Sequence, residues 1–371
     1  MNLPVPSLRQ PERAAIPGLP ERLIELHLHV GGAVAPHILF AMAHEQGFKL
    51  PVRSYFDFVD LVTSNPEKVK SLDDYLRILH EWTEKIQSSP MAIERAVYEI
   101  IGKEYRGSRV TTMELRFNPM KRNLGGERDL DHIIHAALRG MDRACLDYDI
   151  RAGLIFCLAR EFSPELNEIL VDKAIKYAHR GVIGIDLAGT EHNSLELDHT
   201  TVARYAGLFK RARDAGLGTT VHTGETPMTN GEGVIAVIRH LKPHRVGHGI
   251  RAAYHEEAMK VISGEGVVLE ICPTSNLHTR AVSGLAELSF VLRRFLAEKV
   301  KFTINTDATY MLATDLRREV ELLYRGGILG AEEIHQCFVD AEEASFLSWR
   351  MSEVSSSSTW RSEPPRPLSK K

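Results

Sequence analysis

Eight short apolar segments of strand-like composition recur along the 371-residue chain, and their alternation with helix-like segments limits the fold more than any other feature. They lie at residues 22–30, 111–117, 152–159, 181–189, 218–224, 245–249, 266–273 and 301–308. The intervening segments carry apolar residues at helical spacing, as in 130–148 and 286–299. Strands that alternate with helices form parallel sheets through right-handed crossovers. Eight such units predict an α/β fold of the closed (β/α)8 type, a TIM barrel.

An open, doubly wound parallel sheet is the alternative to the barrel. That fold requires a glycine-rich nucleotide loop of the G-x-G-x-x-G type after the first strand. The first apolar segment is followed by GGA at 31–33, which does not match this pattern. The sequence therefore favours the barrel.

One long gap separates the first two apolar segments. Residues 31–110 have helical patterning and exceed what one connecting helix needs, so we expect a helical insertion over the C-terminal mouth of the barrel, as a lid or pocket wall. The barrel domain is predicted to span 21–349, after an irregular lead-in at 1–20. Residues 350–371 are rich in Ser and Pro, a composition that predicts a disordered tail.

The charge and composition of the chain argue against several classes of function. The chain carries 46 Lys and Arg against 49 Asp and Glu, so there is no basic surplus that would indicate nucleic-acid binding. No stretch approaches the roughly 18 apolar residues of a membrane span, and the N-terminal segment lacks an apolar signal region. The four Cys are scattered without a C-x-x-C pair, which is typical of a reducing compartment. We therefore expect a cytoplasmic protein that binds neither nucleic acid nor membrane; the oligomeric state stays open.

Polar side chains end several of the predicted strands. His27 and His29 are two residues apart and so lie on the same side of the first strand, while His222, His248 and Asp307 end the fifth, sixth and eighth. Reactive groups of a TIM barrel project from these C-terminal strand ends. Imidazole nitrogens with one carboxylate suit Zn²⁺ or a similar divalent metal. The alternative is that these residues merely end strands and meet solvent.

Two further positions could contact a substrate. Glu225 follows His222 by three residues, where a carboxyl group can act as a general acid or base, or can simply favour a helix start. Gly189 ends the fourth strand, where a glycine permits close approach of a flat ligand, or is an ordinary strand-to-loop glycine.

Together these motifs make the chain similar to the adenosine deaminase family of the amidohydrolase superfamily. The matching motifs, in order, are ELHLHVGGA, MELRFNP, GIDLAGTE, VHTGE, RVGHG, CPTSN and INTDA. They span roughly residues 22–347. The family's fold is a (β/α)8 barrel, which agrees with the strand count.

The resemblance implies a metal-dependent hydrolytic deaminase. The zinc ligands that it implies are His27, His29, His222 and Asp307. It also implies that Glu225 protonates purine N1, that His248 orients the metal-activated water, and that the Gly189 backbone contacts the purine. The reaction would convert a small-molecule 6-aminopurine nucleoside, adenosine or a 5′-modified form, into the 6-oxopurine and ammonia.

Two positions depart from the family pattern. Gly31 stands where the family usually has a carboxylate that reaches the ribose hydroxyls, and Ala308 stands where a second Asp usually contacts purine N7. These substitutions, with Arg122 as a cation for a carboxylate or phosphate, predict a nucleoside altered on its 5′ side. Aminodeoxyfutalosine of menaquinone biosynthesis, which some family members deaminate, is one such substrate. The alternative is that Lys121 and Arg122 form a solvated loop.

Other functions and smaller assignments stay open. Another metal-dependent amidohydrolase would cleave an amide, ester or phosphate bond without releasing ammonia from a purine. A catalytically idle nucleoside-binding relative would be expected to have lost ligands or the acid, and all of them are present. Arg116 is expected to form a structural ion pair with Glu114 or a neighbouring strand end. Three polar residues after the seventh strand, Thr274, Ser275 and Asn276, either line the pocket or form a polar turn.

Overall fold

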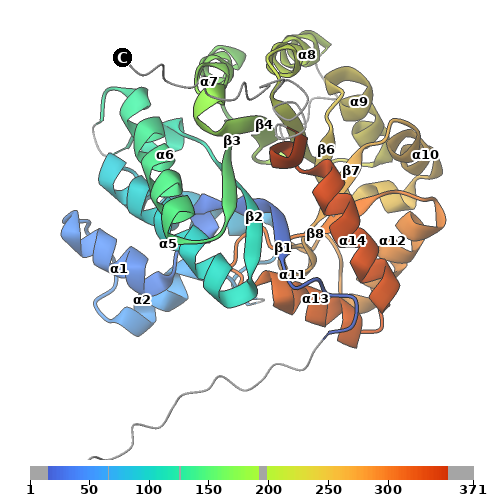
Figure 1. The fold of residues 1–371 in the computed structure, drawn as a ribbon, viewed down its shortest axis with the longest axis horizontal. Coiled ribbons are helices and arrows are strands. Elements are labelled where there is room, and N and C mark those ends of the chain that lie inside the picture. The colour runs from blue at the N-terminus through green and yellow to red at the C-terminus, as the bar shows by residue number, and fades with distance from the viewer. Residues whose placement is uncertain (1–15, 66, 125–126, 192–198, 350–371) are drawn as a thin grey trace, which may run out of the picture.

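Eight parallel strands form the centre of the computed structural model, surrounded by helices (Figure 1). The structure describes residues 16–65, 67–124, 127–191 and 199–349, so the predicted tail lies outside the described residues. The strands are β1 (Leu23–His29), β2 (Val110–Phe117), β3 (Arg151–Ala159), β4 (Val182–Ala188), β5 (Gly218–Thr223), β6 (Arg245–His248), β7 (Val268–Ile271) and β8 (Phe302–Ile304). Their order in the sheet follows the chain, and every neighbouring pair is parallel. The predicted TIM barrel is confirmed.

The barrel closes between its first and last strands. Leu28 of β1 and Asp307, just beyond β8, form an isolated parallel bridge. Two backbone hydrogen bonds support it, from the N–H of His29 to the Asp307 carbonyl (2.7 Å) and from the N–H of Asp307 to the His27 carbonyl (2.8 Å). The seam of the barrel therefore passes directly through the predicted metal site.

The strands read as continuous apolar runs because both of their faces are covered. In β3 every residue from Gly153 to Ala159 is buried. An outer ring of amphipathic helices covers the outer face: α5 (Pro90–Ser108), α6 (Leu130–Asp147), α7 (Pro164–Lys176), α8 (His199–Asp214), α9 (Gly231–Leu241), α10 (Glu256–Gly264), α12 (Leu285–Ala297), α13 (Leu316–Arg325) and α14 (Ala331–Ala344). A short α11 (Pro273–His278) follows β7. Single-turn segments are η1 (Val30–Gly32), η3 (Met120–Arg122), η4 (Ala178–Arg180) and η7 (Ile250–Tyr254).

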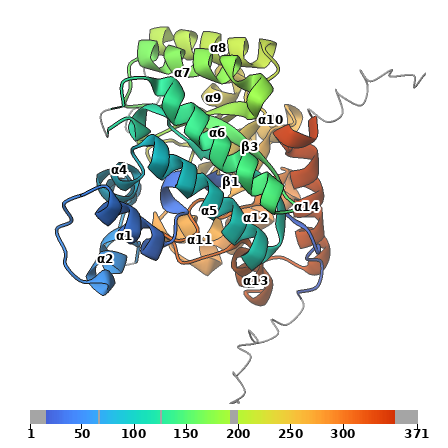
Figure 2. The same cartoon turned by 60° about the vertical axis from the view of Figure 1, so that its left-hand side comes forward.

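The long segment after β1 is helical and divides into two parts. The first comprises α1 (Pro36–Glu45), α2 (Tyr55–Val62), α3 (Leu72–Ile78), the π-helix η2 (Leu79–Thr83) and α4 (Glu84–Ile86). Figure 2 shows α1, α2 and α4 grouped together, across the molecule from α14. The second part, α5, packs against α6 and β2 as an ordinary ring helix because it buries an apolar stripe. The insertion proper is therefore narrower than residues 31–110.

Three of these elements form one continuous helix, residues 72–86, which we call the cap helix. Its central turn, η2, is π-helical, a local widening that often occurs at functional sites. Ser71 caps its start by accepting a hydrogen bond from the N–H of Asp74. Among the described residues, no helix combines the length and apolar character that a membrane crossing requires.

Candidate metal-dependent active site

Four of the predicted ligands meet at the C-terminal end of the barrel. His27 and His29 come from β1, His222 from β5, and Asp307 from the turn after β8. His29 Nε2 lies 3.1 Å from His222 Nε2 and 3.6 Å from Asp307 Oδ1, and His27 Nε2 lies 3.8 Å from the same Asp307 oxygen. The structure thus brings together residues that are up to 280 positions apart (307 − 27).

The donor set fits a divalent metal ion. One donor atom from each of His27, His29 and Asp307 lies within 4.8 Å of the others. His27 Nε2 is buried and has no hydrogen-bond partner among the described residues, a costly state unless something binds there. Burial lowers the pKa of both His27 and His29 well below the usual value, so the rings are neutral, the form that coordinates metals. Three imidazoles and a carboxylate match the ligand types of Zn²⁺.

Carboxylates behind the histidines orient two of the rings. Glu270 Oε2 lies 2.7 Å from His27 Nδ1, and Asp186 Oδ2 lies 3.0 Å from His222 Nδ1. A carboxylate at Nδ1 favours the tautomer with its proton there, which leaves the Nε2 lone pair for the metal. Both carboxylates come from within strands, Asp186 from β4 and Glu270 from β7.

Arg116 joins the two carboxylates. Its Nη1 lies 3.1 Å from Asp186 Oδ2 and its Nη2 lies 2.9 Å from Glu270 Oε2, with all three side chains fully buried. It also donates to the Leu26 carbonyl of β1 at 2.6 Å. The structural ion pair expected for Arg116 is thus present, with carboxylates of other strands as its partners. Glu114, the other expected partner, lies 2.6 Å from Arg245 Nη2 instead.

Glu225 and His248 form one wall of the site. His248 Nε2 lies 3.6 Å from Glu225 Oε2, and both side chains are buried. Burial is the main reason that the pKa of Glu225 is well above its usual range, with the nearby Asp307 adding to the shift. Burial also lowers the pKa of His248 to about 3. The site therefore places a carboxyl group with a raised pKa beside a neutral imidazole.

Ser275 and Asn276, in α11 after β7, neither line the two cavities nor form a plain polar turn, and instead contact site residues. Ser275 Oγ donates to Asp307 Oδ2 at 2.6 Å. Asn276 Nδ2 lies 2.9 Å from His248 Nδ1. Each of them holds a predicted site residue from behind.

Two site residues have a left-handed backbone. His248 has φ of 63° and Asp307 has φ of 64°, a region that costs a non-glycine residue roughly 1–3 kcal/mol. Strain of this kind persists only where the surrounding structure enforces it, and it is concentrated at functional sites. Here the hydrogen bonds across the barrel seam fix Asp307.

Two small adjoining cavities lie under the cap helix. The inner cavity, about 40 Å³, is lined by His29, Leu72, Tyr75, Leu76, Leu79, Ala188, Gly189, His222, Glu225, His248 and Asp307. The side cavity, about 50 Å³, shares His29, Leu76, Leu79, Ala188 and Gly189 with it. The side cavity extends to Gly31, Glu84, Asn118 and Arg122. A ligand in one cavity can therefore reach the other.

The four residues that were predicted to contact the substrate do not all line the same cavity. Gly31 and Arg122 line the side cavity, and Gly189 lines both cavities. Ala308 is fully buried in an apolar cluster with the cap helix and is absent from the lining of both cavities in the described part of the chain. Arg122 is fully buried, and its Nη1 lies 2.6 Å from Glu84 Oε1, so the solvated-loop alternative is wrong for Arg122.

A glycine is required at Gly189. Its φ is +107°, and a Cβ there would approach the carboxylate oxygens of Glu161 to 2.6 Å. A side chain at this position would therefore strain the backbone and would displace the Glu161 carboxylate.

The sequence analysis did not identify several residues that surround the site. Asp186 and Glu270 carry a usable signal, because an acid inside an otherwise apolar, buried strand needs a partner. Glu84 carries no such sequence signal, since it is one of several acids in a helical insertion.

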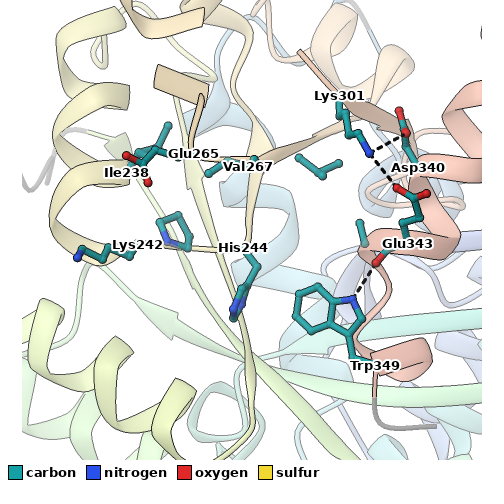
Figure 3. A pocket seen from close by; sticks show the side chains of 13 residues that line it. Ile238, Lys242, His244, Glu265, Val267, Lys301, Asp340, Glu343 and Trp349 are labelled. Carbon is teal, nitrogen blue, oxygen red and sulfur yellow. Dashed lines mark hydrogen bonds and ion pairs between the residues drawn. The ribbon is translucent and has the colours of Figure 1, made fainter. Parts of the chain in front are cut away.

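A larger cavity of about 380 Å³ lies at the opposite end of the barrel (Figure 3). It is lined by residues at the starts of β6 to β8 and by Trp349, whose indole N–H donates to the Glu343 carbonyl at 2.7 Å. Lys301 lies between Asp340 and Glu343 there. Because TIM-barrel active sites lie at the C-terminal face, this cavity is not a candidate for the chemistry.

The fold and site define a class: a metal-dependent hydrolase built on a (β/α)8 barrel. Comparisons with known proteins narrow this class to one family. The sequence model of the adenosine deaminase family matches residues 22–354. An adenosine deaminase of Vibrio vulnificus (strain YJ016) is 30% identical over 325 residues, 88% of this chain and 94% of the relative. The chain belongs to the adenosine deaminase family and is a hydrolytic deaminase.

Solved structures share the fold. An adenine deaminase from Arthrobacter aurescens superposes with a TM-score of 0.77 at 21% identity, covering 91% of this chain and 96% of that one. An amidohydrolase from Burkholderia ambifaria with bound zinc superposes with a TM-score of 0.75 at 22% identity, covering 90% of each chain. These identities carry no conclusion beyond the fold.

Proposed function

We propose that this protein deaminates a 6-aminopurine nucleoside, adenosine or a 5′-modified form, to the 6-oxopurine and ammonia, with zinc as its metal. One observation carries the proposal: the buried acid Glu225 and the imidazole of His248 share a cavity with the ligands His29, His222 and Asp307. A buried carboxyl group with a raised pKa beside a metal site suits protonation of a ring nitrogen. A hydrolase of amides, esters or phosphates has no need of that step.

The chain's own groups account for the remaining chemistry. A bound zinc ion supplies a water nucleophile that is active near neutral pH. Glu225 donates its proton to purine N1, which makes C6 more electrophilic. His248 orients the attacking water through Nε2 and is itself positioned by Asn276 at Nδ1. Gly189 allows the flat ring to approach the backbone at the end of β4.

The substrate requires movement of the cap helix. The two cavities together enclose about 90 Å³ (40 + 50), whereas pockets for small-molecule ligands typically enclose roughly 300 Å³ or more. Leu72, Tyr75 and Leu79 of the cap helix close the space over the ligands. This supports a lid role for the cap helix, which opens to admit a nucleoside and excludes water when it closes.

The test is ammonia release and the ultraviolet change from amino- to oxopurine by zinc-loaded protein. The substrates are adenosine, 2′-deoxyadenosine, adenine, AMP and aminodeoxyfutalosine, and Glu225→Gln is the blank. We expect turnover of a nucleoside at least tenfold better than of adenine. A clear preference for aminodeoxyfutalosine or AMP would assign the 5′-modified class and make Arg122 the next residue to test. No turnover of any aminopurine would overturn the proposal.

A further inference from the structure

Glu225, the proposed acid, lies on a tight turn that follows β5. Gly224, one residue earlier, has a φ of +66°, which bends the chain away from the strand. The backbone of such a turn determines where the carboxyl group points, and a group that transfers a proton must be held closely in its productive position. The contacts of residues 223–226 therefore decide how well the acid is aimed.

The end of β6 fixes the carbonyl groups of this turn. The N–H of Gly249 donates to the Thr223 carbonyl at 3.1 Å, and the N–H of Arg251 donates to the Gly224 carbonyl at 2.8 Å. Both bonds join backbone groups, so a change of side chain does not remove either partner. They hold the part of the turn that precedes Glu225.

A single side chain, Glu191, holds the N–H groups of the turn. Glu191 Oε1 accepts from the N–H of Glu225 at 3.1 Å, and Oε2 accepts from the N–H of Thr226 at 2.7 Å. Oε2 also accepts from the Thr226 hydroxyl at 2.5 Å. In the part of the chain that the structure describes, these two N–H groups have no other acceptor. The acid's own backbone is thus fixed by Glu191.

The environment of Glu191 makes these hydrogen bonds strong. The residue is only 3% exposed, and a carboxylate removed from water requires hydrogen-bond donors. Both of its oxygens are used by the turn. Hydrogen bonds to an ionised carboxylate are shorter and stronger than those between neutral groups. Glu191 also lies two residues after Gly189, so the loop proposed to contact the purine ring fixes the acid as well.

Arg160, just beyond β3, holds the neighbouring strand end. Its guanidinium donates to the carbonyl of His222, and its charge interacts with that of Glu191. Arg160 therefore holds the backbone of a proposed metal ligand, and Glu191 holds the backbone of the proposed acid. Because these contacts are separate, loss of Glu191 should displace the acid and spare the ligand.

We propose that Glu191 is a positioning residue for the deamination, which aims the Glu225 carboxyl group at the reacting ring by holding the N–H groups of Glu225 and Thr226. The inference rests on the proposed function, in which Glu225 is the proton donor. Among the described residues that line the two cavities under the cap helix, Glu191 is not included. It therefore acts through Glu225 and does not contact the substrate.

The experiment is a double-mutant cycle on kcat and KM, with zinc-loaded protein and the aminopurine that the wild-type enzyme converts fastest. Glu191→Ala should lower kcat 10- to 100-fold, change KM less than threefold and leave the zinc content unchanged. In the Glu225→Gln background, the same substitution should change kcat less than twofold, because no proton donor is left to position. A residue with a merely structural role would lower kcat by the same factor in both backgrounds.

Glu161→Gln is the matched control. Glu161 accepts from the N–H of Thr190 at 3.3 Å, so it holds the loop that carries Glu191 without contacting the turn of Glu225. This variant should keep kcat and KM within twofold of the wild-type values. A loss of kcat as large as that of Glu191→Ala would mean that the rigidity of the loop sets the rate, and would overturn the inference.

A second variant and a second measurement apply if Glu191→Ala does not fold. Glu191→Gln keeps one acceptor oxygen but turns an amino group toward the other N–H of the turn, so kcat should still fall at least fivefold. Hydrogen exchange requires no turnover: the amides of Glu225 and Thr226 should exchange faster in either variant, whereas amides within α9 should not. Unchanged exchange at both amides would overturn the inference.

Wild-type kcat in Glu191→Ala, or an equal loss in both backgrounds, would overturn the inference as well. Failure of the proposed function looks different. The wild-type protein would then release no ammonia from any aminopurine, or Glu225→Gln would stay active, and the role of Glu191 would fall with that of the acid.

Discussion

At the scale of single residues, Glu225 shows how burial prepares a group for proton transfer. Burial raises its pKa well above the usual range, so the carboxyl group gives up its proton less readily to water than an exposed one does. Glu225→Gln keeps the size and polarity but cannot transfer a proton, so kcat should fall by about 10²–10⁴. Bound zinc, measured by atomic absorption, should be unchanged. Retention of more than a tenth of the activity in a zinc-replete variant would remove Glu225 from the proton-transfer role.

Glu319 is a second buried acid, and its effect is on stability. It lies at the start of α13, accepts from the Thr274 N–H at 2.9 Å and pairs with the Thr314 hydroxyl. Burial raises its pKa to about 7 from an ordinary value of 4.5. The folded state therefore holds this proton more tightly than the unfolded state does. The resulting stabilisation is complete below about pH 4.5 and is lost as the pH rises through 7.

We predict that Glu319→Gln removes this pH dependence. A difference of 2.5 pKa units corresponds to about 3 kcal/mol of unfolding free energy. Urea unfolding at pH 5 and pH 8 measures it: the wild-type protein should lose more stability between these values than the variant. Glu321→Gln, on the same helix, is the control and should follow the wild-type protein. An identical pH response in Glu319→Gln and wild type would contradict the prediction.

At the scale of elements, Arg116 connects three strands behind two of the proposed metal ligands. From β2 it pairs with Asp186 of β4 and Glu270 of β7, which orient His222 and His27. Arg116→Gln should leave both carboxylates free to turn, so that zinc affinity, measured by chelator competition, falls about 10- to 100-fold.

Arg245 provides the matched control for Arg116. It is equally buried and its Nε lies 2.7 Å from Glu270, but its other partner is Glu114 rather than a carboxylate beside a ligand. Arg245→Gln should destabilise the fold with a smaller loss of zinc affinity. Equal zinc affinities in Arg116→Gln and wild type would show that Arg116 is only structural.

The elements were predictable from sequence because their signal is local. Apolar runs locate each strand to within a few residues, although the eighth was expected over 301–308 and ends at Ile304. Beyond it the chain leaves the strand so that Asp307 can adopt its left-handed backbone. The candidate metal ligands were equally visible as polar residues at strand ends. The partners behind them were not, because pairing His27 with Glu270 depends on the register around the whole barrel.

The side cavity was hidden from sequence for the same reason. In the sequence, the glycine at position 31 looks like a missing carboxylate. Only the packing of the cap helix shows that Leu79 Cδ1 and Glu84 Cγ border the space beside it. Arg122 was identified as a cation, but its neutralisation by Glu84 depends on a contact 38 residues away in the chain (122 − 84). The structure therefore shows a paired, buried cation where the sequence predicted one that was free to bind an anion.

At the scale of the whole molecule, the metal site lies across the seam of the barrel. β8 is joined to β1 by one isolated bridge, in contrast to the continuous pairing of the other strands. His27 and His29 lie on β1, whereas Asp307 lies beyond the end of β8. A metal held by these three residues would connect the first and last strands of the barrel. We infer that it contributes to closing the barrel as well as to the reaction.

Removal of the metal should therefore weaken the barrel at one place. Free zinc at 1,000 times its Kd adds about 4 kcal/mol to the unfolding free energy, and chelation removes this contribution. In hydrogen exchange, the amides of His29 and Asp307, which bond across the seam, should exchange faster after chelation. The amides that pair β3 with β4 should not change. Added zinc should restore slow exchange at these amides in the wild-type protein but not in Asp307→Ala. A uniform change in exchange rate across all strands would mean that the metal stabilises the barrel without closing the seam.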